Sequence, residues 1–168
     1  RWTDEICGFY ASGEADYLKA IELEPKTAGN YEKLAELYLL AGETEKAVDI
    51  LKKGYEEQTG KEFKIPDNLD DYVELCKYIT SSKGDELSGA VMMGLRPDPI
   101  TVEFMNYFFS CGADFYDEEG NITVNSPEAV HALDLYVDNM NNTAPSGSPS
   151  FGFDEAFNVF AQGNAASF

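Results

Sequence analysis

The sequence is poor in basic residues, with 12 Lys and Arg against 31 Asp and Glu, and its formal net charge is -19. A surface that neutralises phosphates or anionic lipids needs clustered Lys and Arg. We therefore expect neither a nucleic-acid partner nor an anionic membrane surface. Long apolar runs are missing as well, because no stretch reaches the roughly 20 residues that span a bilayer. These absences predict a soluble protein.

Cysteine and histidine are also scarce. The three cysteines, Cys7, Cys76 and Cys111, are widely spaced and form no C-x-x-C pair, so neither a disulfide framework nor a zinc site is indicated. His131 is the only histidine, which leaves a catalytic triad or a metal cluster without partners. No Gly-rich phosphate loop is present. We therefore expect no metal, no cofactor and no enzymatic activity.

Acidic residues gather near Gly120 and match a calcium-binding loop only in part. A calcium-binding loop needs acidic residues in an alternating register and a bidentate Glu twelve positions along. Neither is present around Asp114, Asp117, Glu119 and Asn121. We favour a solvated turn over a calcium site.

Residues 31–55 carry apolar side chains at helical spacing in two runs, with Gly42 between them. This spacing predicts two helices packed as a hairpin, with Lys and Glu on the solvated face. The apolar positions are Tyr31, Leu34, Ala35, Tyr38, Ala47, Val48, Leu51 and Tyr55.

Residues 8–59 resemble tetratricopeptide repeats. The segment from Gly8 to Pro25 is similar to the second helix of one repeat, and residues 31–54 keep the order of the next, although Gly13 and Gly54 replace the usual alanines. The resemblance implies a helical surface that could bind a peptide or protein. Tyr31, Tyr38 and Tyr55 would either line such a groove or pack in the core, and we favour packing.

The pattern changes between Gly60 and Pro66, which predicts two domains, residues 1–62 and 63–168. Strand and helix signals alternate after this boundary. A helix is expected from Asn68 to about residue 83, a buried strand over 88–95, and a helix over 101–111 that ends at Gly112. In that last helix, Phe104, Met105 and Phe108 should face inwards.

Three further elements follow. Residues 115–124 predict a hairpin that turns at Gly120. Ser126-Pro127-Glu128 is a strong helix start, and the helix should run through Val130, Leu133, Val137 and Met140. A polar loop over 141–150 precedes a last helix over 154–162. The chain is thus predicted to be α+β and mostly helical.

Residues 66–168 resemble the second lobe of the bacterial extracellular solute-binding proteins of ABC sugar importers. Four local features match in order: the helix opening at 66–71, the strand over 88–94 with the turn at 110–114, the hairpin and helix start over 117–130, and the helix end Phe160-x-x-Gly163-Asn164-Ala165-Ala166. The resemblance implies an α/β lobe fragment that follows the tetratricopeptide-like helical hairpin.

A function is implied by the same resemblance, namely binding of a small-molecule solute, a carbohydrate, as a component of an ABC importer. Ligands of open α/β folds bind beyond the carboxyl ends of strands, and in this family the loop at 94–99 faces the cleft. Arg96 and Asp98 are therefore expected to bind hydroxyls, beside Thr101, while Phe104 or Phe151 offers a stacking face. The alternative is a proline-stiffened turn with solvated charges.

Partners and location are likewise implied by the family. The importer's membrane subunits should bind the protein outside the cell or at the cell envelope, although this chain shows no signal peptide. Two alternatives stay open. One is a tetratricopeptide-type interaction scaffold without a small-molecule ligand, and the other is a composite joined from two sources near residues 60–66.

Overall fold

The structure, a computed structural model, describes the backbone of residues 2–168 and the side chains of residues 9–84 and 86–168. Helices dominate this part, and it holds no strand. The prediction of a mostly helical chain is therefore confirmed, whereas the expected α/β lobe shows no regular sheet here. The chain divides into two compact units, one that ends at Ile65 and one that spans Pro66–Phe168. The side chain of Cys7 lies outside the described part.

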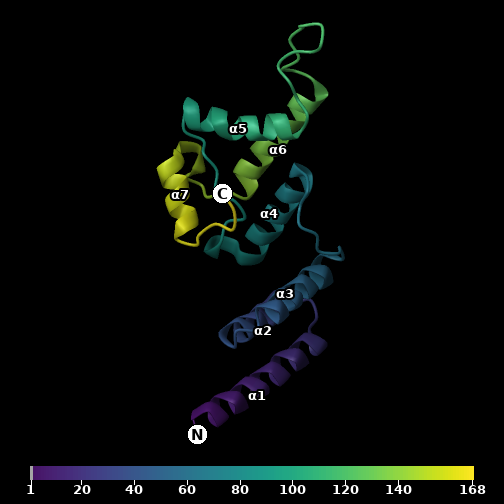
Figure 1. The fold of residues 1–168 in the computed structure, drawn as a ribbon, viewed down its shortest axis with the longest axis vertical. Coiled ribbons are helices and arrows are strands. Elements are labelled where there is room, and N and C mark those ends of the chain that lie inside the picture. Colours follow the sequence, from purple (N-terminus) through teal and green to yellow (C-terminus); the bar gives the residue numbers. More distant parts are fainter. Residues whose placement is uncertain (1) are drawn as a thin grey trace. The chain divides into compact units, whose positions relative to one another are not determined.

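The first unit consists of three helices: α1 (Trp2–Leu23), α2 (Ala28–Leu40) and α3 (Thr44–Thr59). Figure 1 shows α2 and α3 side by side, joined by a tight turn at Gly42, whose φ of 78° is the left-handed value that ends a helix. Tyr31 and Tyr38 lie in the core, as the sequence predicts. The buried core residues are Ile21, Tyr31, Leu34, Ala35, Tyr38 and Ala47.

The buried face of α3 agrees with the prediction at Ala47 but not at Val48 and Leu51. Ala47 and Gly54 are buried, whereas Val48 and Leu51 are both 44% exposed. The reason is the ring of Tyr31, which occupies the space beside Gly54: a Cβ on Gly54 would lie 2.8 Å from Tyr31 Cγ. Small residues on α3 thus let the two helices approach closely enough to bury the tyrosine.

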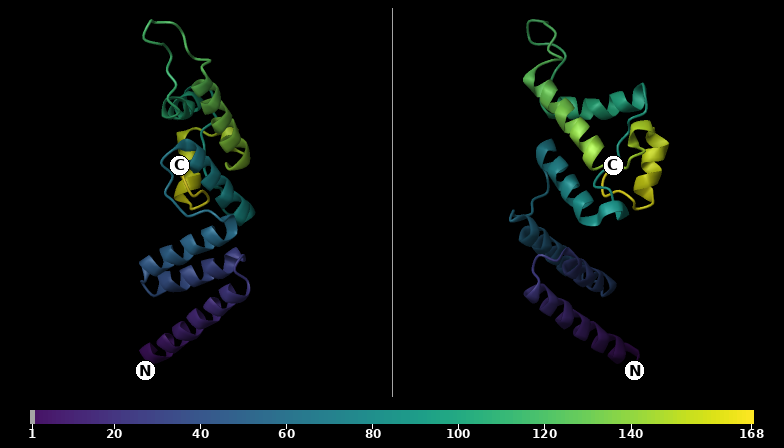
Figure 2. Two further views of the ribbon diagram at one scale, coloured as in Figure 1. Left: turned by 90° about the vertical axis from the view of Figure 1, so that its right-hand side faces the viewer. Right: turned by 180° about the vertical axis from the view of Figure 1, so that it is seen from behind.

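The second unit contains α4 (Leu69–Lys83), α5 (Asp98–Ser110), α6 (Pro127–Asn142) and α7 (Phe153–Ala161), with 3₁₀ turns at Gly84–Glu86 and Ser148–Ser150. In Figures 1 and 2, α6 lies against α4 and crosses α5. One core cluster lies between these three helices. Its buried members are Val73, Cys76, Ala90, Met92, Tyr107, Ala132 and Tyr136.

Helix starts follow the local signals in the sequence. Asn68 caps α4 by accepting the Asp71 N–H at 2.9 Å, and Ser126 caps α6 by accepting the Ala129 N–H at 3.2 Å. Helix α5 begins at Asp98 rather than at the predicted Thr101. The reason is that Pro99 is tolerated in a first turn, where its missing N–H has no intrahelical partner to lose.

Helix α6 turns a different face inwards from the apolar positions that mark it in the sequence. Val130, Leu133 and Val137 are 45–51% exposed. The buried residues are instead Ala129, Ala132, Tyr136 and Asn139, which also recur at helical spacing. Two alanines on this face allow the close contacts with α4 and α5 that longer side chains would prevent.

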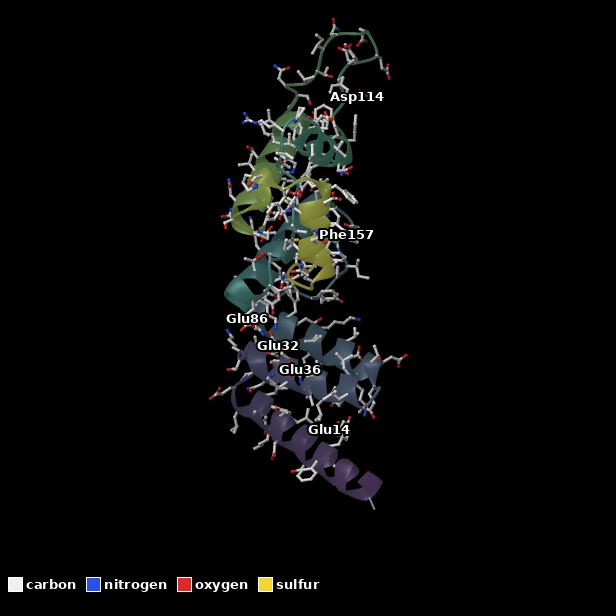
Figure 3. The ribbon with its side chains drawn as sticks, turned by 90° about the vertical axis from the view of Figure 1, so that its left-hand side faces the viewer. Glu14, Glu32, Glu36, Glu86, Asp114 and Phe157 are labelled. Carbon is white, nitrogen blue, oxygen red and sulfur yellow. The ribbon has the colours of Figure 1, made fainter. Side chains whose placement is uncertain are left out.

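The predicted hairpin projects from the helices as a loop (Figures 1 and 2), with Asp114 at its base (Figure 3). It has a single bridge between Tyr116 and Ile122 rather than a ladder. Gly120, with a φ of 83°, makes the turn. The Asp117 carboxylate accepts the backbone and side-chain N–H groups of Asn121 at 2.7 and 2.8 Å, and these bonds lower its pKa. The described residues hold no group of three or more potential metal-ligating His, Cys, Asp or Glu side chains.

The predicted strand at Ser88–Leu95 is extended but forms only one parallel bridge, between Ser88 and Ala165. Its backbone groups pair with loops instead: Ser88 N–H donates to Asn164 O at 3.1 Å and Val91 N–H donates to Ser167 O at 3.0 Å. Because these partners are irregular segments, no ladder forms. Among the described helices, none is long and apolar enough to cross a membrane.

Replacing Gly54 by Ala should destabilise the first unit. The new methyl would overlap the near end of the Tyr31 side chain, and overpacking of this kind costs about 1–3 kcal/mol, more than the roughly 1 kcal/mol that Ala gains over Gly in a helix. Faster amide hydrogen exchange in α2 and α3 would report the loss. Gly29→Ala is the matched control, since nothing lies within 4 Å of its added Cβ. Equal protection in both variants would contradict this account of the α2–α3 contact.

Candidate functional site

Two loops meet in the second unit and form the candidate site, which we call the two-loop site (residues 94–101 and 147–153). Gly94 N–H donates to Ser148 O at 2.9 Å, and Leu95 N–H donates to Phe151 O at 3.0 Å. These bonds join the end of the extended segment to the stretch that leads into α7. The site therefore has a fixed backbone frame instead of two independent loops.

Glycine makes the close approach possible. A Cβ on Gly94 would lie 2.5 Å from Pro149 Cα and 2.8 Å from Ser148 O, closer than side-chain atoms come. On the other side, a Cβ on Gly152 would lie 3.5 Å from Leu95 Cδ2 and 4.0 Å from Pro99 Cγ. The two loops thus lie close together at Gly94 and Gly152. Any larger residue at position 94 would push them apart.

The polar candidates lie on the first of these loops and at the start of α5. Arg96, Asp98 and Thr101 are all exposed. The Thr101 hydroxyl donates to Pro97 O at 2.8 Å, so it can only accept a further hydrogen bond. Arg96 is the only Lys or Arg in residues 84–168. The loop therefore brings one guanidinium, one carboxylate and one hydroxyl to the surface within six residues.

The two aromatic candidates have different surroundings. Phe151 is half-buried and packs against the cluster of Val91, Ala156 and Ala165 beside the second loop. Phe104 is half-buried in the core between α5 and α6, where its ring centroid lies 5.7 Å from that of Tyr136 and 6.0 Å from that of Phe108. The two-loop site therefore contains Phe151, while the ring of Phe104 already serves the core.

A further aromatic residue at the site was missed by the sequence analysis. Phe153 is the first residue of α7, directly after Gly152, and it is 62% exposed. The sequence Phe151-Gly152-Phe153 does not reveal which ring faces the core. In the structure, the Gly152 N–H donates to the Glu155 carboxylate at 2.9 Å. This cap starts α7 in an orientation that turns Phe153 to solvent.

Burial changes the pKa of Glu103, a carboxyl residue of α5. Desolvation raises its pKa, and a hydrogen bond from the Met93 backbone opposes that rise. Met93 directly precedes Gly94, so Glu103 binds the extended segment next to the two-loop site. Its ionised form is disfavoured there, since a half-buried carboxylate loses hydration that one hydrogen bond does not replace.

His131 is a surface residue, as expected from the sequence. Its ring is exposed, and Nε2 lies 3.1 Å from Asp70 Oδ2 at the start of α4. An exposed pair of this kind contributes little to stability, and it lies on elements outside the two-loop site.

The model of the family described as bacterial extracellular solute-binding protein matches residues 14–168. The chain belongs to this family. The match extends over both units, from the middle of α1 to the last residue. The helical segment before residue 66 therefore falls within the family match, and no match to tetratricopeptide repeats supports the other resemblance.

Individual members of the family are similar over parts of the chain. A probable ABC transporter-binding protein of Deinococcus radiodurans is 34% identical over 79 residues, which are 46% of this chain and 19% of that protein. An arabinooligosaccharide-binding protein of Halalkalibacterium halodurans is 28% identical over 142 residues, 82% of this chain and 30% of that protein. The chain thus spans less than a third of either relative.

Two solved structures share the fold. The solute-binding protein of an Agrobacterium radiobacter K84 ABC transporter, in complex with ribitol, has a TM-score of 0.55 and 28% identity over 66% of this chain and 27% of its own. Maltose-bound MalE3 of T. maritima has a TM-score of 0.53 and 31% identity over 68% of this chain and 29% of its own. One of these structures holds ribitol and the other holds maltose.

Gly94→Ala should separate the two loops. The added methyl meets backbone atoms, which cannot rotate away, so we expect a loss of about 1–3 kcal/mol in the free energy of unfolding. Exchange of the Leu95 amide, which donates to Phe151, should accelerate even when the rest of the unit stays protected. Denaturant unfolding and hydrogen exchange measure both effects, with Gly29→Ala as the control. An unchanged Leu95 amide would show that the loops are not joined in this way.

Glu103→Gln should change how stability depends on pH. The folded-state pKa of Glu103 is raised, so its contribution to stability is fully present below the ordinary carboxyl pKa and is lost as pH rises through the folded value. We expect the variant to gain in unfolding temperature relative to the parent as the pH rises above the ordinary carboxyl pKa. Glu118→Gln, in the exposed hairpin, is the matched control. A constant difference at all pH values would mean that Glu103 titrates normally.

Proposed function

We propose that the chain is part of the solute-binding component of an ABC importer and that its solute is a carbohydrate. The family match over residues 14–168 carries this proposal. Support for the carbohydrate comes from relatives: one is named for arabinooligosaccharides, and two solved structures hold ribitol and maltose. We further propose a binding role without catalysis, because the family is described as solute-binding.

The chemistry of the two-loop site fits a polyhydroxyl solute. Carbohydrates present hydroxyl edges, which need directed hydrogen bonds, and apolar C–H faces, which pack on aromatic rings. Arg96 and Asp98 supply a donor fork and an acceptor pair. Phe151 and Phe153 supply the ring faces on the second loop. The site thus combines both kinds of contact in one surface held by the Gly94 and Leu95 hydrogen bonds.

Each polar residue would have a distinct role. The Arg96 guanidinium can donate to two neighbouring hydroxyls at once. Asp98 lies in the first turn of α5, and its carboxylate oxygens would accept hydrogen bonds from hydroxyls. Thr101 has already donated its proton to Pro97 O, so it would accept from a hydroxyl. Phe104 would stabilise the core beneath these groups.

The partners and location that we propose are those of the family. Membrane subunits of an ABC importer would receive the solute, and the protein would act outside the cell or at the cell envelope. The family description, extracellular solute-binding protein, supports this location.

An interaction scaffold built on the helical segment is the second candidate, and the structure gives it little support. Tyr31 and Tyr38 are only 1% and 6% exposed, so they pack in the core and cannot line a groove. Their hydroxyls bond within the unit, to Pro25 O and to Glu14 Oε1, both at 2.8 Å. The same family model matches both units, which also favours one origin over a composite.

Carbohydrate binding should appear as amide shift changes confined to the two-loop site. We expect titration of the isotope-labelled chain with a panel of pentoses, hexoses, polyols and short oligosaccharides to shift the amides of residues 94–101 and 147–153. Arg96→Ala and Asp98→Ala should each weaken binding about tenfold, since a charged hydrogen bond contributes about 1.5–3 kcal/mol. Glu118→Ala is the control. Shifts centred elsewhere, or none with any solute, would contradict the proposal.

A further inference from the structure

Helix α1 has little apolar contact with the rest of the first unit over its first half. Among the described side chains of α1, Ile21 alone is buried, and it lies near the C-terminal end of the helix. Nearer the N-terminus, a Cβ on Gly13 would lie 3.4 Å from Leu37 Cδ2 of α2, whereas Phe9 is 82% exposed. Apolar packing therefore holds the end of α1 more firmly than its beginning.

Polar side chains hold the beginning of α1 against α2 and α3. The Tyr10 hydroxyl of α1 donates to Glu43 Oε2 at 2.9 Å. In the opposite direction, the Tyr38 hydroxyl of α2 donates to Oε1 of Glu14 on α1 at 2.8 Å (Figure 3). Lys46 of α3 lies 2.6 Å from Glu43 Oε2 through its Nζ. We call these five residues the tyrosine–carboxylate cluster.

Glu43 is the centre of the cluster, and the turn between α2 and α3 fixes its backbone. Its N–H donates to Tyr38 O at 2.8 Å, and it occupies the N-cap position of α3, where the helix dipole favours a carboxylate. In the described part of the chain, the titratable groups that face it are Tyr10 and Glu14 from α1, Tyr38 from α2 and Lys46 from α3. Two carboxylates therefore share one ammonium at the junction of three helices.

The hydrogen bonds of the cluster are strongest with protonated phenols and ionised carboxylates. Burial, and next the hydrogen bond to Glu14, raises the pKa of Tyr38 to about 12, so this hydroxyl stays a donor at neutral pH. The Lys46 ammonium, and next the Tyr10 hydroxyl, lowers the pKa of the Glu43 carboxyl. A carboxyl of this kind stabilises the fold above its ordinary pKa, and the contribution is lost as the pH falls through the folded-state value. Acid therefore weakens the cluster.

We propose that the tyrosine–carboxylate cluster is an acid-sensitive contact, which releases the first half of α1 from α2 and α3 while these two helices stay packed on each other. The contact between α2 and α3 is apolar, with Leu34 and Ala47 buried and the ring of Tyr31 against Gly54, so protons do not weaken it. Ile21 in the same core keeps the far end of α1 attached. Such partial opening is the usual behaviour of segments with few buried apolar contacts.

The experiment measures amide hydrogen exchange along the full chain at neutral pH and at about one unit below the ordinary carboxyl pKa, with each rate divided by that of an unstructured peptide at the same pH. We expect the protection of residues 10–17 to fall about fivefold in acid relative to that of α2 and α3, a modest effect because the cluster is partly exposed. The double variant Glu14→Gln/Glu43→Gln keeps the acceptor oxygens but cannot ionise. It should show the lower protection at neutral pH and no further loss in acid. Glu45→Gln, in the first turn of α3, is the matched control and should behave as the parent.

The possible results have distinct meanings. Protection of residues 10–17 that keeps pace with α2 and α3 in acid overturns the inference, and so does a double variant that matches the parent at both pH values. If the parent loses protection everywhere in acid, the double variant at neutral pH decides: selective loss over residues 10–17 supports the contact, and equal protection overturns it. None of these results depends on solute binding, so the proposed function is tested separately.

Discussion

The second unit depends on hydrogen-bond partners for the backbone of the extended segment Ser88–Leu95. Its backbone N–H and C=O groups lie among the helices, where an unpaired group costs about 1–3 kcal/mol, and no strand ladder is present to pair them. Loops supply the partners instead: Asn164 and Ser167 near its start, Ser148 and Phe151 near its end. The loops are therefore positioned by the hydrogen bonds that this segment needs, and the two-loop site results from that pairing.

A chain of buried polar groups connects the same segment to three helices. Gly89 N–H donates to Thr80 Oγ1 at 2.8 Å, and Thr80 Oγ1 donates to Thr143 O at 3.2 Å. Thr143 in turn bonds to Asn139, whose Nδ2 donates to Tyr107 Oη at 2.7 Å. Each bond adds only about 1 kcal/mol net. Because both partners of each are satisfied, the chain also fixes one register for the segment between α4, α5 and α6.

The sequence correctly predicted the features that depend on a few adjacent residues, namely helix caps and turns. The caps at Asn68 and Ser126 and the turns at Gly42 and Gly120 follow from local backbone chemistry, so their positions were found. The buried faces of α3 and α6 were not, since Gly54 and Ala132 carry no hydrophobic signal and are buried because of what packs against them. The predicted strand failed for a related reason: its apolar run is real, but a ladder depends on partners distant in sequence.

At the candidate site, too, the sequence predicted the local feature but not the one that depends on packing. The loop with Arg96 and Asp98 was identified from its place after an apolar run, and the structure brings it against Phe151. The choice between Phe151 and Phe153 was beyond the sequence, because only the Gly152–Glu155 cap decides which ring meets solvent. Exposure alone does not assign a role, however, and Phe153 is placed at the site by its position two residues after Phe151, whose carbonyl accepts the Leu95 N–H.

Charge limits the kind of solute that this surface can hold. Arg96 is the only Lys or Arg in residues 84–168, and Asp98 stands two positions from it. An anionic solute would meet one cation beside a carboxylate on a chain of net charge -19, so attraction and repulsion would nearly cancel. A neutral polyhydroxyl solute avoids this conflict, because the guanidinium and the carboxylate then act as donor and acceptor to different hydroxyls. If the proposed site binds the solute, its charges favour neutral sugars over sugar acids and phosphates.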